Sequence, residues 1–316
     1  MSTVIHDDVP AAAEHHHGKR DRAARLTTQG KPRTGRYLLL GIGLWLFLGL
    51  VLDHLFHNQI VRGGWIVLGA ALVPTALVYA MAHRLRVTDT LSVATLVKAF
   101  IVGGFFAFTI GATFDTLVSI LAPGTDGGPS LISYALSGIV EEASKAALVI
   151  FIGWKVAKTV RNGLFLGGAV GAGFALFETI GYIDYAPTML GGNPAAVDGE
   201  LFQAITAVER AITMPVGHPL WAALLGAAIF AAASQTGKFR ITPLVVLAYL
   251  GVAFLHGMWD SGRVILMDLV PNKEIAGLAA LPLELVLGLV GGLIWLRVVR
   301  HANKLEASRI EEAPVA

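Results

Sequence analysis

The sequence predicts an all-α, polytopic membrane protein, a bundle of about eight transmembrane helices. Its 316 residues are 55% hydrophobic and only 15% charged, and the mean hydropathy is +0.66, far from the balance of a soluble domain. Eight apolar segments have membrane-spanning length, and Lys and Arg collect in alternate loops between them. Length, hydropathy and charge therefore predict the same fold class.

The eight apolar segments cover residues 37–56, 64–82, 96–121, 131–154, 163–185, 214–234, 241–263 and 277–297. A helix of about 20 residues crosses the roughly 30 Å hydrocarbon core of a bilayer. The first segment follows a basic stretch, as a signal sequence does, but it has spanning length and no small-residue cleavage site. We therefore expect it to remain as a span.

The positive charges predict the orientation of the chain. Eighteen of the 24 Lys and Arg residues lie before the first segment, at or beyond the end of the last, or in the loops after the second, fourth and sixth. Four lie in the other loops, and Lys98 and Lys145 lie within segments. Because cytoplasmic loops carry the excess of basic residues, both termini are predicted to be cytoplasmic.

The regions outside the spans are short. Residues 1–36 are polar and basic without apolar periodicity, which predicts a disordered cytoplasmic tail. Residues 37–300 form the transmembrane domain, and 301–316 a short cytoplasmic tail. The connection 186–213 holds an amphipathic stretch at 200–212, which we expect to be a surface connector or, alternatively, a cover over a cavity mouth.

Several classes of site are excluded. The chain has no cysteine, so it has no disulfide, thiolate nucleophile or Cys-ligated metal. A net charge of +2 gives no support for a nucleic-acid partner. The partner indicated by composition is the lipid bilayer.

Four polar strings interrupt consecutive apolar segments. They are EEASK from Glu141, FETIGY from Phe177, the single His218, and HGMWD from His256. From the predicted ends, these residues lie about 6 to 15 Å below the outer surface. Ionisable groups at such depth are costly, and four at similar depth predict one shared polar site.

Helical spacing indicates how the charges are compensated. Lys145 lies four residues after Glu141 and three after Glu142, so it can pair with either carboxylate. Successive side chains point about 100° apart, so we assign one glutamate to the chemistry and the other to support. Asp260, four residues after His256, can orient that imidazole.

Each string also has a plain structural interpretation. The Glu–Lys cluster could be a packing ion pair, and His256 with Asp260 a satisfied buried histidine. Asp115 lies on the same side as the strings but outside them, and we do not assign it to the site. The glycines at 163, 167 and 171, and at 288 and 292, resemble helix-packing faces.

The ordered set of strings matches a known series. EEASK, FETIGY, His218 and HGMWD fit E-E-x-x-K, F-E-x-x-x-Y, H and H-x-x-W-D on successive segments. In this the chain resembles the PrsW family of bacterial intramembrane proteases, and more distantly the type II CAAX-processing and bacteriocin-processing proteases. The motifs cover residues 131–263, and outside that core only the hydropathy profile matches.

The resemblance implies an intramembrane protease whose domain is 37–300, in the multi-pass inner membrane of a bacterium. It implies cleavage near the outer leaflet of a single-span, membrane-anchored protein such as an anti-sigma factor. Carried over by position, the catalytic candidates are Glu141, Glu142, Glu178, His218 and His256. The supporting residues are Lys145, Tyr182, Trp259 and Asp260.

Two mechanisms fit these side chains. A glutamate could act as the general base on water, with a histidine at the oxyanion or the leaving amine. Alternatively, Glu178, His218 and His256 could hold Zn²⁺, because two imidazoles and a carboxylate form an open catalytic zinc site. The sequence leaves both mechanisms open.

Two other functions compete with proteolysis. A proton- or cation-coupled transporter also uses intramembrane Glu and His, although the halves show no repeat and the polar residues crowd into spans four to seven. A non-catalytic scaffold on the same fold could bind a single-span partner. The near-complete set of motif residues favours an active protease.

Overall fold

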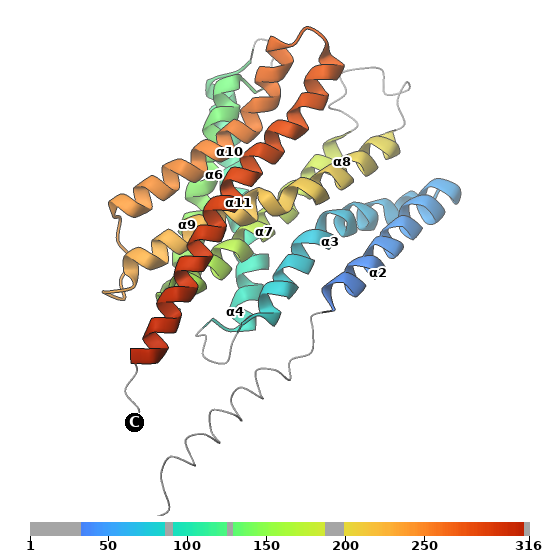
Figure 1. The fold of residues 1–316 in the computed structure, drawn as a ribbon. Helices are drawn as coiled ribbons and strands as arrows, with labels where there is room; N and C mark the ends of the chain where they lie inside the picture. Colours follow the sequence, from blue (N-terminus) through green and yellow to red (C-terminus); the bar gives the residue numbers. More distant parts are fainter. Residues whose placement is uncertain (1–32, 86–90, 125–128, 187–198, 313–316) are drawn as a thin grey trace, which may run out of the picture. The chain divides into compact units, whose positions relative to one another are not determined.

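The computed structural model describes residues 33–85, 91–124, 129–186 and 199–312, which are almost entirely helical (Figure 1). The predicted disordered tail up to residue 32 and most of the connection before 199 lie outside the described residues. From Thr34 onward the helices pack as one unit.

The helices follow one another in the order that hydropathy predicts. They are α2 (Thr34–Leu46), α3 (Arg62–His83), α4 (Val93–Lys98), α5 (Gly104–Leu121), α6 (Leu131–Ile152), α7 (Val160–Tyr185), α8 (Gly199–Thr213), α9 (His218–Ala233), α10 (Pro243–Leu269) and α11 (Lys273–Glu312). Wider π-helical turns extend α2 to Leu55 and join α4 to α5.

Seven helical stretches in the described part of the chain are long and apolar enough to cross a membrane. The 22-residue α6 has spanning length too, but Glu141, Glu142 and Lys145 make it less apolar than the others. With α6 counted, the prediction of an all-α polytopic bundle of about eight spans is confirmed.

Hydroxyl side chains define where several helices begin. Ser92, Ser130, Thr159 and Thr242 each accept a hydrogen bond from the backbone amide three residues later, at the first turns of α4, α6, α7 and α10. These caps satisfy amides that have no partner within the helix. They fix the start of each helix and therefore the height of its polar residues.

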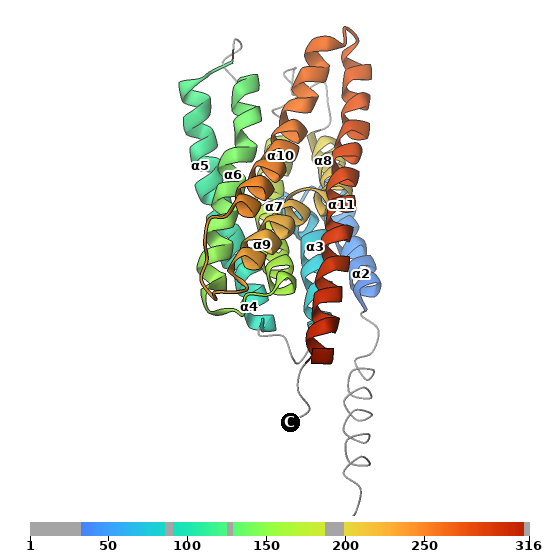
Figure 2. The same cartoon turned by 60° about the vertical axis from the view of Figure 1, so that its left-hand side comes forward.

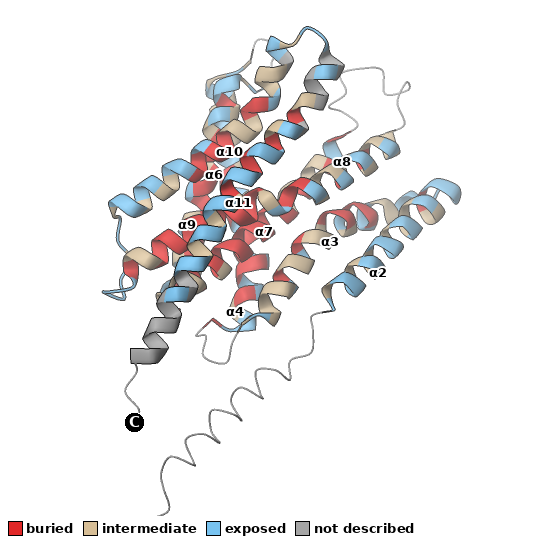
Figure 3. Ribbon diagram, viewed as in Figure 1, coloured by how far each residue is buried: buried red, intermediate tan, exposed pale blue. Residues whose placement is uncertain are grey.

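The helices α7 and α9 form the centre of the bundle, and their residues are the most deeply buried (Figure 3). A Cβ atom on Gly163, Gly167 or Gly171 would lie only 2.0 to 2.3 Å from a backbone carbonyl oxygen of α9. Only glycine allows this approach. The predicted packing face at these three positions is therefore present, and it sets His218 beside the middle of α7.

A second close contact joins α6 to α10, which lie side by side in Figures 1 and 2. A Cβ on Gly138 would lie 2.2 Å from the Ala253 carbonyl oxygen, and one on Gly257 2.5 Å from that of Ala135. Of the other predicted pair, Gly288 packs against Val216, whereas Gly292 faces open space.

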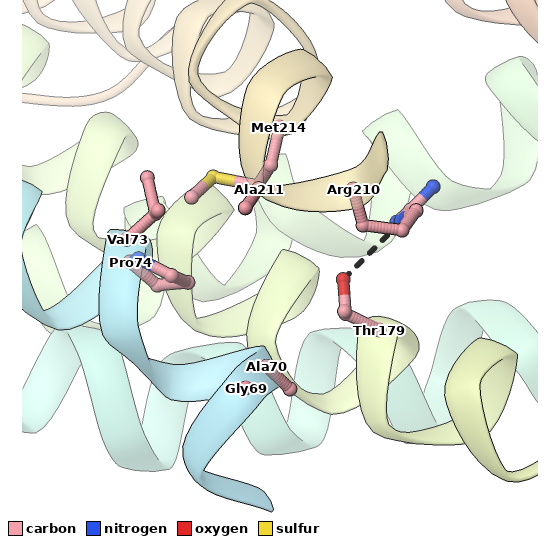
Figure 4. A pocket seen from close by; sticks show the side chains of 8 residues that line it. All are labelled: Gly69, Ala70, Val73, Pro74, Thr179, Arg210, Ala211 and Met214. Carbon is pink, nitrogen blue, oxygen red and sulfur yellow. Dashed lines mark hydrogen bonds between the residues drawn. The ribbon is translucent and has the colours of Figure 1, made fainter. Parts of the chain in front are cut away.

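The amphipathic stretch 200–212 differs from the predicted surface connector. It forms α8, which runs alongside α3: Glu200 pairs with Arg62 at the start of α3. Further along, Ala211 and Met214 line a small pocket with Val73 and Pro74 (Figure 4). One face of α8 therefore packs against the other helices of the bundle.

After a break at Gly217, the chain continues in the same general direction as α9 (Figures 1 and 2). By length and composition, residues 199–233 are one candidate span that includes this break. The outward face of α8 carries Leu201, Ile205, Val208 and Ile212, all exposed as lipid-facing residues would be. His218 is the first residue of α9, close to one end of that helix, as the sequence predicted.

Two helices are longer than predicted. The 27-residue α10 ends at Leu269 and not at 263, which makes His256 its fourteenth residue. Glu141 is likewise the eleventh of the 22 residues of α6. His256 therefore lies nearer the middle of its helix than the predicted end suggested, whereas Glu141 keeps its predicted place near the middle of α6. In α11 the helix continues through the predicted tail to Glu312.

Candidate active site

The polar residues of α6 belong to a buried polar cluster. Lys145 is completely buried and its Nζ lies 3.2 Å from Glu141 Oε2 and 2.8 Å from Glu142 Oε1. It also lies 3.8 Å from the ring centre of Phe174. The predicted compensation of both glutamates by Lys145 is therefore present. Gly111 on α5 leaves room for Glu141, because a Cβ there would lie 3.2 Å from Glu141 Cγ.

His256 comes from α10 and is completely buried. Its Nδ1 lies 3.0 Å from Glu142 Oε1, so the imidazole donates this proton to the carboxylate. Its Nε2 has no hydrogen-bond partner among the described residues, yet it lies 3.5 Å from Glu141 Oε2 and 3.3 Å from Asp260 Oδ2. Asp260 is held by Ser137 Oγ at 2.6 Å.

His218 begins α9 and turns its two ring nitrogens toward different charges. Its Nε2 lies 2.8 Å from Glu178 Oε2. Its Nδ1 lies 2.9 Å from Lys145 Nζ and 4.0 Å from Glu141 Oε2. Since an ammonium can only donate, Nδ1 is the acceptor and Nε2 carries the proton. The ring centres of His218 and His256 are 4.8 Å apart.

Glu178 on α7 is bound from two sides. It contacts His218, and it forms an ion pair with Arg210 of α8. The Arg210 guanidinium also covers the ring of Tyr182 at 4.6 Å from its centre. Tyr182, predicted to support the site, therefore reaches it through Arg210.

Trp259, the remaining residue predicted to support the site, reaches it through a second tryptophan. It packs against Trp221 with ring centres 5.4 Å apart. Trp221 in turn lies 4.7 Å from the ring centre of His256. Trp221 lies in no predicted motif, and its apolar segment gave no signal that it would contact the site.

Asp115, which the sequence did not assign to the site, approaches it. It lies on α5, where its carboxyl group interacts with that of Glu141, and its Oδ1 is buried with no hydrogen-bond partner among the described residues. Two carboxyl groups in contact are stable when they share a proton or a cation. Its position on the outer side of its span was the available signal.

The cluster contains more acidic side chains than fixed cations. Its five carboxyl groups belong to Asp115, Glu141, Glu142, Glu178 and Asp260, whereas its fixed cations are Lys145 and Arg210. An uncompensated charge inside a membrane is expensive. The cluster is therefore suited to hold an additional cation.

The donor atoms for a metal ion are also present. Glu141, His218 and His256, all buried, offer ligand atoms that lie within 4.8 Å of one another. The predicted set named Glu178 in place of Glu141. The unpartnered Nε2 of His256 faces carboxylate oxygens, and such electron-rich atoms are stable together only with a proton or a metal ion between them. The residues thus fit a bound divalent cation.

Comparison with known families agrees with this site. The sequence model described as PrsW family intramembrane metalloprotease matches residues 92–287, which contain every residue of the cluster. Comparison with curated proteins and with solved structures finds no match.

Proposed function

Because the chain belongs to the PrsW family of intramembrane metalloproteases, we propose that it hydrolyses a peptide bond of a membrane-anchored protein at the buried cluster. The observation that supports this most strongly is the convergence of Glu141, His218 and His256, which come from α6, α9 and α10. Separate helices supply the three donors, as expected for a site built by the fold.

We propose Zn²⁺ as the metal, held by Glu141, His218 and His256. Two imidazoles and one carboxylate are a known catalytic zinc set, and a bound zinc ion polarises a carbonyl and activates water. Glu178, which the sequence placed among the metal candidates, would then orient His218. Glu142 would orient His256 in the same way, since carboxylates commonly fix ligating imidazoles.

The other polar residues of the cluster accept or donate protons and balance its charge. Asp260, held by Ser137, lies 3.3 Å from His256 Nε2 and can accept a proton at Oδ2. Asp115 can exchange a proton with Glu141. Lys145 neutralises the glutamates and donates to His218 Nδ1. His218 would have to exchange this donor for the metal ion.

A metal-free mechanism uses the same contacts differently. If the Lys145 ammonium remains the cation of the cluster, Glu141 acts as the general base on water and His256 as the acid. The contact of Lys145 with His218 Nδ1 favours this second mechanism. The metal content of the purified, active protein distinguishes the two mechanisms.

For the substrate we propose a single-span membrane protein, for which an anti-sigma factor is the first candidate to test. We place the protein in the inner membrane of a bacterium with both termini cytoplasmic, as the basic loops predict. Cleavage would take place toward the outer leaflet.

The test uses a co-expressed single-span reporter. Glu141→Ala, His218→Ala and His256→Ala are each expected to abolish its cleavage, because each removes a donor of the cluster. Asp184→Asn, which changes an exposed acid on α7, serves as the matched control and should cleave normally. Cleavage by all three alanine variants would refute the proposed function.

The metal is tested on detergent-purified protein. We expect one zinc ion per chain, loss of cleavage after treatment with a chelator, and recovery when Zn²⁺ is added. Full cleavage by protein shown to be free of metal would leave the glutamate mechanism in its place.

A further inference from the structure

Arg210 lies on α8, outside all four motifs, yet its guanidinium reaches the cluster. It pairs with the carboxylate of Glu178, and its Nε donates to Thr179 Oγ1 at 3.2 Å. The planar guanidinium covers the ring of Tyr182. Only 16% of the Arg210 side chain is exposed. A buried cation with partners of three kinds has one defined position.

Two further ion pairs hold the helix that carries Arg210. At its start, Glu200 pairs with Arg62 of α3. Next to Arg210, Glu209 pairs with Arg263 of α10 at 2.6 Å. Both pairs are more exposed than the Arg210–Glu178 pair, and Arg263 is 48% exposed, so each holds α8 only weakly.

Arg210, Glu178 and His218 form a continuous series of contacts. Glu178 Oε2 receives Nε2–H of His218 at 2.8 Å and also contacts Arg210. A carboxylate can accept several donors at once. Without Arg210, Glu178 would be a poorly compensated buried acid, free to rotate away from the imidazole.

We propose that Arg210 is a positioning residue: it fixes Glu178, which in turn fixes the ring of His218 with Nδ1 toward Glu141. This role depends on the proposed function, because the orientation of His218 matters only if His218 takes part in the reaction. Arginine suits the position better than lysine, since its planar fork can reach Glu178 and Thr179 together and stack on Tyr182.

Metal affinity provides the first test. The purified full-length chain is titrated with Co²⁺, whose visible spectrum reports coordination geometry, in competition with a chelator. Arg210→Gln is expected to lower the affinity on the order of 10-fold and to alter the spectrum, as loss of residues behind metal ligands does. Arg263→Gln removes another ion pair of α8 without touching Glu178 and should bind as the unaltered protein does. Equal affinities for the two variants would overturn the proposal.

A double-mutant cycle tests whether Arg210 acts through Glu178. If it does, adding Arg210→Gln to Glu178→Gln causes no further loss of Co²⁺ affinity or of kcat for the reporter. Losses that simply add would show that Arg210 acts independently and would contradict the proposal. Thermal unfolding of each variant identifies any that fail to fold, and Arg210→Lys, which keeps the charge, gives an intermediate kcat at unchanged KM.

The two proposals fail differently. If the unaltered protein binds no Co²⁺ but cleaves the reporter, the proposed metal site is refuted. The role of Arg210 is then tested by the effect of the double-mutant cycle on kcat alone. A coupled loss of kcat then supports positioning by Arg210, and an additive loss or no loss overturns it. If the unaltered protein binds Co²⁺ and Arg210→Gln binds it equally well, only the role of Arg210 is lost.

Discussion

His218 and His256 turn different ring nitrogens toward Glu141, and this difference is set by two carboxylates. Glu178 lies at Nε2 of His218, 40 residues away along the chain. Glu142 lies at Nδ1 of His256, 114 residues away. The motifs predicted both histidines but not which nitrogen each offers, because that depends on partners brought together only by the fold.

Glu142→Gln tests this arrangement at the level of one atom pair. The variant keeps an acceptor for His256 Nδ1–H but loses the charge that strengthens the hydrogen bond. We expect zinc affinity to fall on the order of 10- to 100-fold, measured by competition with a chelator. Glu209→Gln, which removes an acid of the Arg263 pair, is the control. An unchanged affinity would show that Glu142 only packs.

Asp115 shows the limit of motif reasoning for single residues. The series of strings pointed to four spans, and Asp115 lies on an earlier one. Its contact with Glu141 arises because α5 packs against α6 at Gly111, where the absence of a side chain leaves space. Apart from its position on the outer side of its span, nothing local to Asp115 distinguishes it from an ordinary polar residue of a span.

At the scale of elements, the path of glycines along α7 determines where α9 lies. The spacing of four residues was readable from the sequence and predicted a packing face. The partner helix was not readable, because α9 offers backbone and small side chains at this contact and has no matching motif. The contact places His218 against the middle of α7 and so helps to define the site.

Gly167→Ala is expected to loosen this contact. Its Cβ would lie 2.0 Å from the Ala222 carbonyl oxygen, so α7 and α9 must separate. Overpacking of this kind costs about 1 to 3 kcal/mol, visible as a lower unfolding temperature in detergent. Gly181→Ala on the same helix meets no atom of the described residues within 4 Å and should be neutral or slightly stabilising. Similar unfolding temperatures for both variants would contradict the expected role of Gly167.

The helix α8 departs most from the plain connector that the sequence predicted. Its charged residues Glu200, Glu209 and Arg210 are typical of a surface helix. In the structure their partners are Arg62, Arg263 and Glu178, on three other helices. Pairing allows charged residues to enter the bundle, and pairs formed over such sequence distances leave no local signal.

For the whole molecule, fold class and number of spans followed from the sequence because hydropathy is a local property. Helix ends were less certain: α10 and α11 run beyond their apolar segments with residues that also favour helix. The error in the end of α10 moved the estimated depth of His256. The orientation of the chain in the membrane stays a prediction from its basic loops.

The absence of cysteine makes the topology directly testable. Ile60 and Ile241 are 94% and 87% exposed and lie in loops that are predicted to be on opposite sides of the membrane. Variants with a single cysteine at either position are treated in intact cells with a membrane-impermeant maleimide. We expect labelling of Ile60→Cys and none of Ile241→Cys until the cells are permeabilised. Ile212→Cys should remain unlabelled in both conditions, because we place α8 in lipid. Labelling of Ile212→Cys in intact cells would show that α8 lies at the membrane surface and not in lipid.

The break at Gly217 has an electrostatic consequence for the site. It puts the amino end of α9 inside the bundle, with His218 as the first residue of the helix. Peptide dipoles aligned along a helix give its amino end roughly half a positive elementary charge. This charge belongs to the backbone, persists at every pH and survives any side-chain substitution. An interrupted span therefore helps the protein keep so many acids away from water, and a continuous helix through residue 217 would not.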